Sequence, residues 1–399
     1  MKRTAATLTV LTAVLGTASP ALASPVPASP GGHGRGTLVS ATHLTTVSKA
    51  KAVKLLKAEG YDPRTVRFGV DTYRLVYRTI DENGRPTRAS GLLVLPRRKA
   101  TGLRTVSWTH GTTSFKGDAP STSSDGFGLG APLTYGTAGF ATVAPDYLGL
   151  GKGPGIHPWM HLPSETSASL DMLRAARRYS PKVGRDVLVT GFSQGASASL
   201  GLSRALQRGE DRRFRLRATA PVSGGYDLGG VEIPQLLAGR LDPKLSVIYT
   251  TYLLVNWNRR VHLYDDPAEV FRKPYAAKAE KLFDGTVPGE VMFPALPGTI
   301  GELLTPHGRR LLARPPANLA RALRTETALT CGWRARTPVR LFVMPGDEQA
   351  ASANTVSCAA SLAGERVVRL KPAVYNGSRH LGSNVTATGK IVRWFLTFR

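Results

Sequence analysis

A Gly-x-Ser-x-Gly motif near the middle of the chain contains a serine with the surroundings that a nucleophile requires. Residues 187–195 read VLVTGFSQG, and the residues that follow are small, ASAS. A buried strand, a sharp turn and a helix in this order form the nucleophile elbow of hydrolases. The two glycines let the strand and the helix pack closely, and the helix start directs backbone N–H groups at an oxyanion. We therefore expect Ser193 to attack the carbonyl carbon of an acyl substrate.

A serine hydroxyl becomes a nucleophile when a base removes its proton and an acid orients that base. In hydrolases with this elbow, the acid and then the histidine follow the serine along the chain. A late predicted strand ends in Pro-Gly-Asp-Glu, so we expect Asp347 to be the acid, with Glu348 as the alternative. Among the eight histidines only His380 follows this acid, and it is the predicted base, in a loop. His262 and His307 lie in an inserted segment and fit the order less well.

Two N–H donors are required to stabilise the oxyanion of a tetrahedral intermediate. The backbone N–H of Gln194, directly after the nucleophile, is the first candidate. The second should come from the loop after the predicted strand 105–109, which reads His-Gly-Thr from His110. A glycine lets this backbone approach the substrate. The N–H groups of Gly111 and Thr112 are equal candidates for the second donor.

Two further patterns are typical of binding sites, and neither is complete. His157 and His161 have a spacing that binds zinc on a helix, but Pro158 disfavours a regular helix and no third ligand is evident. Residues 149–155 are rich in glycine and follow a predicted strand, but they lack the G-x-G-x-x-G spacing of dinucleotide-binding loops. We expect neither a metal ion nor a cofactor.

Several short motifs, concentrated between residues 140 and 200, occur together in this chain. They are APDYLGLG at 144–151, His157-Pro158 with His161, Ser164-Glu165, Asp171, LRAA at 173–176 and GFSQG at 191–195. With these motifs the chain resembles the secretory lipase family of α/β-hydrolases, which includes fungal lipase A type enzymes and many actinobacterial secreted lipases. The resemblance covers roughly residues 60–395 and is weakest in the inserted segment.

This resemblance implies lipase or carboxylesterase activity on acylglycerols, with a helical cap over an acyl pocket. It implies a triad of Ser193, Asp347 and His380, the same residues that the chain order selects. The chain departs from the fungal enzymes at the oxyanion loop, which reads His-Gly-Thr where those enzymes can carry an acidic residue. A lipid or another small ester is the implied substrate.

Alternating strand and helix patterns predict an α/β-hydrolase fold, a mostly parallel central sheet flanked by helices, with a helical cap insertion. Strands are predicted at 66–80, 89–95, 105–109, 141–145, 186–190, 218–223, 339–344 and 367–370. Helices are predicted at 47–58, at 164–179, from the elbow to about residue 208, and at 385–398.

The chain divides by composition into a targeting segment, a leader, a core and an insertion. Residues 1–23 have the basic start, short apolar run and Ala-Leu-Ala end of a signal peptide, so we expect a secreted protein. Residues 24–36 are rich in Pro, Gly and Ser and predict a flexible leader. The core is expected at 37–223 and 334–399, and the cap, with apolar and aromatic residues in short helical patterns, at 224–333.

The chain has two cysteines, Cys331 and Cys358. An even number in an exported protein favours a disulfide. The bond would tie the end of the cap to a helix that follows the acid. Two buried free thiols are the alternative.

The net charge of +26 raises the question of nucleic-acid binding. The basic residues are spread along the chain, in pairs such as Arg97-Arg98 and Arg309-Arg310, and no zinc-finger spacing, RNP-like stretch or Walker loop accompanies them. We expect no nucleic-acid partner but a solvated basic surface that favours anionic interfaces, with transient contact to a lipid interface.

The predicted function is a secreted serine ester hydrolase that cleaves acylglycerols or other acyl esters through an acyl-enzyme. Because a fold does not determine its substrate, a secreted serine peptidase or an aromatic-ester (feruloyl-type) esterase is the alternative. A non-catalytic binding protein of this fold is disfavoured, because the Ser, Asp and His set is intact. The sequence leaves acyl chain length and oligomeric state open.

Overall fold

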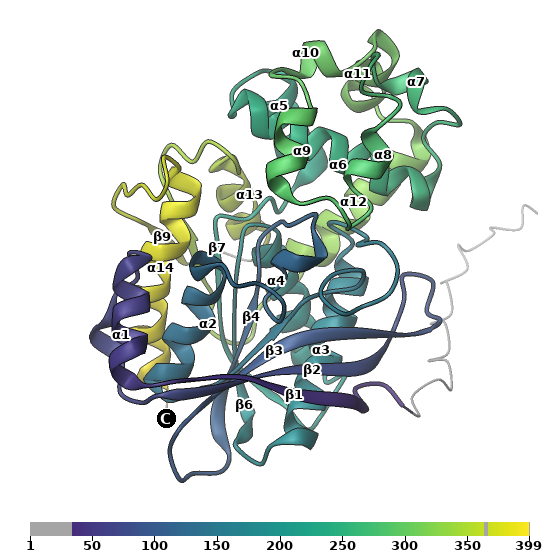
Figure 1. Cartoon of the computed structure of the whole chain (residues 1–399). Helices are drawn as coiled ribbons and strands as arrows, with labels where there is room; N and C mark the ends of the chain where they lie inside the picture. The colour runs from purple at the N-terminus through teal and green to yellow at the C-terminus, as the bar shows by residue number, and fades with distance from the viewer. Residues whose placement is uncertain (1–33, 363–365, 399) are drawn as a thin grey trace, which may run out of the picture. The chain divides into compact units, whose positions relative to one another are not determined.

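A nine-stranded sheet forms the centre of the fold (Figure 1). The computed structural model describes residues 34–362 and 366–398, so the predicted signal peptide and nearly all of the predicted leader lie outside the described residues. The strand order is β1-β2-β3-β5-β4-β6-β7-β8-β9, antiparallel from β1 to β5 and parallel from there on. The strands are β1 Leu38–Val47, β2 Val70–Ile80, β3 Pro86–Pro96, β4 Leu103–Thr109, β5 Ala141–Pro145, β6 Val183–Phe192, β7 Arg215–Val222, β8 Arg340–Val343 and β9 Arg366–Arg369.

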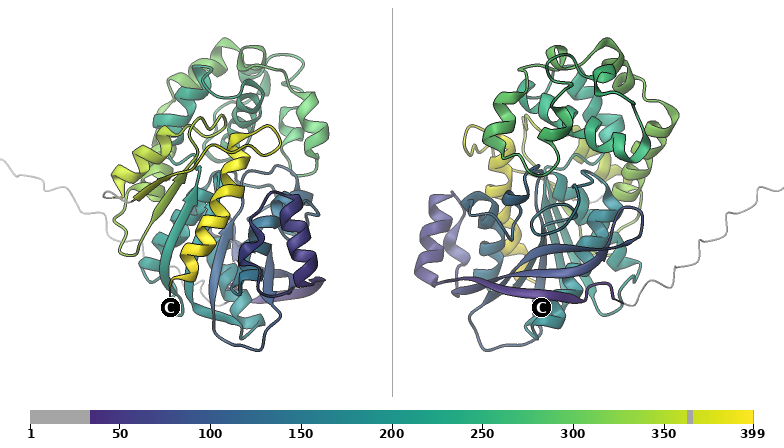
Figure 2. Two further views of the ribbon diagram at one scale, coloured as in Figure 1. Left: turned by 90° about the vertical axis from the view of Figure 1, so that its left-hand side faces the viewer. Right: turned by 45° about the vertical axis from the view of Figure 1, so that its right-hand side comes forward.

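Helices cover both faces of this sheet (Figures 1 and 2), as the sequence predicts. On one face lie α1 (Lys49–Ala58), α2 (Gly126–Ala138) and α14 (Arg379–Leu396), and on the other α3 (Leu162–Tyr179) and α4 (Gln194–Gln207). Apolar side chains alternate between the two faces, because successive residues of a strand point in opposite directions. In β6, for example, Leu188 joins the core beneath α2 and α14, while Val187 and Val189 join the core beneath α3 and α4.

A helical cap separates β7 from β8 in the chain and has an apolar core of its own. Its centre is α6, where Val247, Leu254 and Trp257 are fully buried. The elements of the cap are the π-helical turn Leu228–Glu232, α5 Ile233–Leu237, α6 Pro243–Val261, α7 Pro267–Val270, α8 Ala279–Leu282, α9 Gly289–Ala295, α10 Ile300–Leu303, α11 Pro306–Ala313 and α12 Ala317–Cys331. Apolar residues of the sequence therefore divide between a sheet core and a cap core.

Several elements differ from the sequence prediction. Strand β1 was not predicted, because its side chains are largely exposed and it lies at an edge of the sheet. Helix α2 was not predicted either, because its sequence GFGLGAPLTYGTA is rich in glycine. Two of these glycines allow close packing, since a Cβ at Gly130 or Gly136 would overlap Tyr61 or Val94. The helix expected from residue 385 begins at Arg379, where the hydroxyl of Ser378 accepts the N–H of Leu381.

The cysteines are joined in the structure, as predicted. Cys331 ends α12 of the cap, and its disulfide partner Cys358 lies on α13 (Ala353–Ser361), which follows the acid loop. Both side chains are buried against Leu200 and Leu341 of the core. The disulfide therefore fastens the end of the cap to the core.

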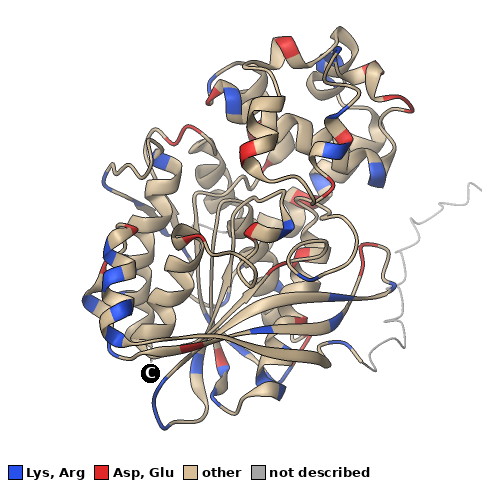
Figure 3. Ribbon diagram, viewed as in Figure 1, with Lys and Arg blue, Asp and Glu red and all other residues tan. Residues whose placement is uncertain are grey.

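The basic residues do not gather at one site. Figure 3 shows Lys and Arg on the helices of the core, at strand ends and on the cap. Within the described part of the chain, no helix has both the length and the apolar character to cross a membrane.

Candidate active site

Ser193 occupies a strained turn between β6 and α4. Its φ and ψ angles are 56° and −122°, a conformation that costs a residue with a side chain about 1–3 kcal/mol. Small neighbours make the turn possible, because a Cβ at Gly195 would overlap the carbonyl oxygen of Thr109. The turn is fixed by the hydrogen bonds of Ser193 N to Val222 O (2.9 Å) and of Thr109 Oγ1 to Gly195 O (2.6 Å). This strand, turn and helix have the form that the motif predicts.

A continuous chain of hydrogen bonds joins Ser193, His380 and Asp347. His380 Nε2 lies 2.9 Å from Ser193 Oγ, and His380 Nδ1 lies 2.9 and 3.0 Å from the two carboxylate oxygens of Asp347. Because a carboxylate only accepts, Nδ1 carries the proton and Nε2 is free to accept from the serine hydroxyl. The prediction that His380 lies in a loop was wrong: it lies in the first turn of α14. Its backbone is thereby held by the helix.

Asp347 rather than Glu348 faces the imidazole. Burial raises the pKa of Asp347, but His380 and the N–H groups of Gln349 and Ala350 outweigh this and lower the pKa below its usual value. Asp347 is therefore ionised at neutral pH. Glu348 instead accepts the hydroxyl of Ser378 at 2.5 Å and the N–H of Arg379 at 3.1 Å, at the start of α14.

The predicted oxyanion loop runs directly beside the nucleophile. A Cβ at Gly111 would lie 3.4 Å from Ser193 Cβ. His110 Nδ1 lies 2.7 Å from the carbonyl oxygen of Gly111, which directs this C=O toward the histidine ring. Since C=O and N–H of a trans peptide point in opposite directions, the N–H of Thr112 points away from that ring. The N–H of Gln194 lies at the N-terminus of α4.

No family model and no curated protein matches this chain in sequence, but its fold matches those of solved structures. It is similar to LipA, a rice cell wall degrading esterase of Xanthomonas oryzae, with a TM-score of 0.77 and 25% identity over 90% of this chain and 97% of LipA. It is also similar to lipase A of Candida antarctica, with a TM-score of 0.61 and 13% identity over 84% of this chain and 76% of the lipase.

The chain therefore shares the fold of lipase-like and esterase-like α/β-hydrolases. This likeness confirms the predicted fold class, and the likeness to the esterase LipA supports the carboxylic ester hydrolase that the sequence predicts.

In this hydrolase, two buried residues hold the side chain of Gln194, and the sequence did not reveal either role. Gln194 Nε2 lies 2.7 Å from His157 Nε2 and 2.7 Å from Glu165 Oε1. His157 Nδ1 in turn donates to the carbonyl oxygen of Leu148 at 3.0 Å. Both residues belong to the motifs of the family resemblance, which was the only signal for them in the sequence.

The same contacts disfavour the zinc pair that the spacing of His157 and His161 suggests. Both nitrogens of His157 are engaged, and burial lowers the pKa of this histidine to about 3. Burial raises the pKa of Glu165 to about 8, so both partners of Gln194 are neutral at pH 7. Within the described residues, no group of three metal-ligating side chains occurs.

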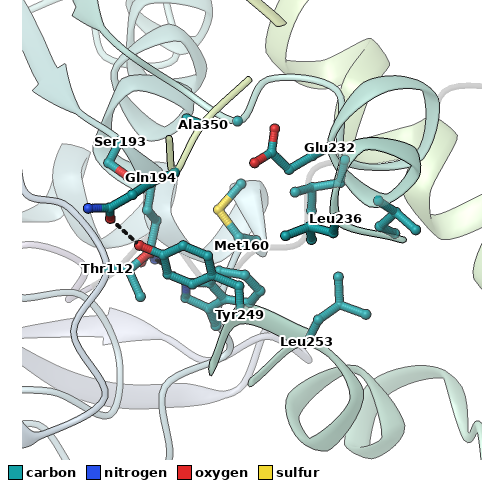
Figure 4. A pocket seen from close by; sticks show the side chains of 14 residues that line it. Thr112, Met160, Ser193, Gln194, Glu232, Leu236, Tyr249, Leu253 and Ala350 are labelled. Atoms are coloured by element: carbon teal, nitrogen blue, oxygen red, sulfur yellow. Dashed lines mark hydrogen bonds between the residues drawn. The ribbon is translucent and has the colours of Figure 1, made fainter. Parts of the chain in front are cut away.

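The hydrolase has a narrow space on one side of Ser193, which we call the inner cavity (Figure 4). Its free volume is about 40 Å³. Figure 4 shows the carboxyl group of Glu232 directed toward this space, opposite the ring of Tyr249. The lining residues come from both core and cap: Thr112, Trp159, Met160, Ser193, Gln194, Gly225, Leu228, Glu232, Ile233, Leu236, Tyr249, Leu253, Gln349 and Ala350.

A wider space, the outer groove, also borders Ser193 and has a volume of about 360 Å³. Unlike the inner cavity, it is lined by His380 and by two exposed carboxylates, Asp118 and Asp125. The other lining residues are Trp108, His110, Gly111, Thr112, Thr113, Phe127, Gly128, Phe192, Ser193, Tyr249, Gln349, Leu381 and Asn384. The nucleophile therefore borders both a small, mostly apolar space and a larger, more polar one.

Proposed function

We propose that this hydrolase cleaves carboxylic esters through an acyl-enzyme on Ser193, with His380 as base and Asp347 as the acid that orients it. The observation that carries the proposal is the hydrogen-bonded chain from Ser193 Oγ to the buried, ionised Asp347, at distances of 2.9 to 3.0 Å. A strained elbow that exposes the serine supports the same role.

In the proposed reaction, His380 Nε2 accepts the proton of Ser193 as Oγ attacks the ester carbon. The tetrahedral intermediate collapses when His380 gives this proton to the departing alcohol oxygen. Water then attacks the acyl-enzyme while His380 accepts its proton. The second tetrahedral intermediate collapses by breaking the bond between its carbon and Ser193 Oγ, as His380 returns the proton to Oγ and the acid product leaves. Asp347 stays ionised throughout, keeping the proton on Nδ1 and stabilising the imidazolium that forms.

The oxyanion is proposed to bind the N–H groups of Gln194 and Thr112. The sequence left Gly111 and Thr112 equal, and the contact of His110 with the Gly111 carbonyl favours Thr112. Thr112 also lines the inner cavity together with Ser193 and Gln194. Two such donors in a site shielded from water stabilise the charge that develops on the carbonyl oxygen.

Secretion and the physiological substrate are part of this proposal. The predicted signal peptide and the disulfide Cys331–Cys358 support export, since disulfides persist in oxidising compartments. LipA, which degrades rice cell walls, is compatible with an ester substrate outside the cell. The substrate is then a lipid or other small ester, with no cofactor required.

Hydrolysis of p-nitrophenyl butyrate, compared with peptide p-nitroanilides, tests the reaction class. We expect rapid hydrolysis of the ester and slow or no hydrolysis of the anilides. Preferred cleavage of an anilide would favour the peptidase alternative. Hydrolysis of feruloyl esters in strong preference to butyrate would favour the aromatic-ester alternative.

A further inference from the structure

The triad determines which part of an ester occupies each space beside Ser193. His380 must reach the oxygen of the departing alcohol to protonate it. His380 lines the outer groove and does not line the inner cavity. If the triad acts as proposed, the alcohol part of the ester lies in the outer groove, and the acyl chain enters the inner cavity.

The inner cavity has room for a short acyl chain only. Its 40 Å³ correspond to about three water-sized groups. Met160, Leu236 and Leu253 line it with apolar side chains. Glu232 adds a buried carboxyl group to the lining. A longer hydrocarbon chain would pack against this polar group without offering it a hydrogen bond, which is unfavourable.

The cap, which supplies part of the lining of this cavity, is fastened to the core at several separate points. Cap groups bond to the loop after β4, to the segment before α3, to the acid loop and to α13, so lifting the cap would break these bonds together. The bonds are Tyr252 Oη to Thr113 O (3.2 Å), Trp257 Nε1 to Trp159 O (3.2 Å), Tyr249 Oη to Gln349 Oε1 (2.8 Å), Asp242 N to Glu348 O (2.8 Å) and Asn354 Nδ2 to Glu232 Oε2 (2.5 Å). The inner cavity therefore keeps its small size as long as these bonds hold the cap on the core.

The outer groove has the opposite character. It offers about nine times the volume of the inner cavity, 360 against 40 Å³. Asp118 and Asp125 make its rim acidic in a chain with a net charge of +26. Carboxylates accept hydrogen bonds from hydroxyl groups and attract cations, and they repel anions.

We propose that the substrate is an ester of a short acyl group, about two to four carbons long, with a polar, uncharged or cationic alcohol. The cap stays in place during turnover, so that the enzyme needs no lipid interface for activity. This proposal rests on the function proposed above, because the position of His380 in the triad decides which part of the ester lies in each space.

Initial rates on p-nitrophenyl esters from acetate to dodecanoate test the acyl part with a constant alcohol. We expect kcat/KM to be highest for acetate to butyrate and about tenfold or more lower for octanoate. Leu253→Ala enlarges the inner cavity and should raise the octanoate-to-butyrate ratio about tenfold. The control Leu254→Ala makes the same truncation at a buried neighbour that does not line the cavity, and it should leave the ratio unchanged. If Leu253→Ala does not fold, Leu253→Val should shift the ratio in the same direction by less.

Equal rates on octanoate and butyrate would overturn the proposal, and so would a sharp rise in rate once an ester exceeds its solubility. Equal ratios in the Leu253 and Leu254 variants would also overturn it. For the alcohol part, kcat/KM should be higher for triacetin than for hexyl acetate, and the reverse order would refute that part. If the protein hydrolyses none of these esters and takes up no fluorophosphonate, the proposed function itself fails, and this proposal with it.

Discussion

Gln194 Nε2 lies 2.7 Å from His157 Nε2, which ties the residue after the nucleophile to a histidine outside the elbow. The N–H of Gln194 is a proposed oxyanion donor, so the side-chain contact fixes the direction of a group that would act in the reaction. We therefore expect His157 to act as a positioning residue.

Replacing His157 should affect the chemical step more than substrate binding. In His157→Ala we expect kcat on p-nitrophenyl butyrate to fall about tenfold or more, with a small change in KM. The reason is that the N–H of Gln194, which would bind the oxyanion mainly in the transition state, is no longer held in place through the side chain of Gln194. The matched control is His307→Ala at an exposed position of the cap, which should retain full activity. An unchanged kcat in folded His157→Ala would refute the positioning role.

The two adjacent acids should behave differently. Asp347→Asn should lower kcat by about 10⁴-fold, because His380 loses the partner that fixes its tautomer. Glu348→Gln should retain most activity and lower the melting temperature, because Glu348 binds the start of α14. Steady-state kinetics and thermal unfolding of both variants distinguish the roles, and a more damaging Glu348→Gln would reverse the assignment.

Stability should fall as the pH rises from 6.5 to about 8. Burial raises the pKa of Glu165 to about 8 and of Glu232 to about 7, from a usual value of 4.5. The folded protein therefore binds protons that the unfolded chain has released, so these acids stabilise the fold at low pH and lose this contribution as the pH rises through 7 and 8. Burial lowers the pKa of His110 to about 4, of His157 to about 3 and of His161 to about 3, so these histidines are neutral in both states above pH 6.5 and do not compensate.

Melting temperatures between pH 6 and 9 check this prediction. Glu165→Gln removes one of the two groups and should flatten the decline. A melting temperature that rises steadily from pH 6.5 to 8 in the parent protein would show that these acids do not determine how stability changes with pH in this range.

Reduction of the disulfide should destabilise the protein without abolishing activity. Cys331 and Cys358 are 27 residues apart, and closing a loop of this length is worth about 3.5 kcal/mol in the chain-entropy model. Denaturant unfolding of the Cys331→Ala, Cys358→Ala double variant measures the loss. A double variant as stable as the parent would contradict the prediction.

The sequence predicts the elbow and the three triad residues because their signals are local or ordered along the chain. Ser193 lies in a short motif, and Asp347 and His380 follow it in the order that the fold imposes. The contacts of Gln194 with His157 and Glu165 join residues 37 and 29 positions apart, and no local pattern encodes such a contact.

The missed elements have physical reasons of their own. β1 pairs only at the sheet edge, so its sequence lacks the burial that marks a strand. In α2, tertiary packing against Tyr61 and Val94 overrides the poor helix propensity of glycine. The size of the inner cavity depends on how cap side chains such as Leu236 and Leu253 meet the core, which composition alone does not determine.

Fluorophosphonates react with serines that a neighbouring histidine activates, so the mass of the peptide that contains Ser193 after such treatment tests most directly whether Ser193 is the nucleophile. We expect one adduct per protein, on Ser193, formed within minutes at neutral pH and absent in Ser193→Ala and strongly slowed in Asp347→Asn. An unmodified Ser193 in the folded parent protein, or an adduct on a different residue, would contradict the claim that Ser193 is the nucleophile of this hydrolase.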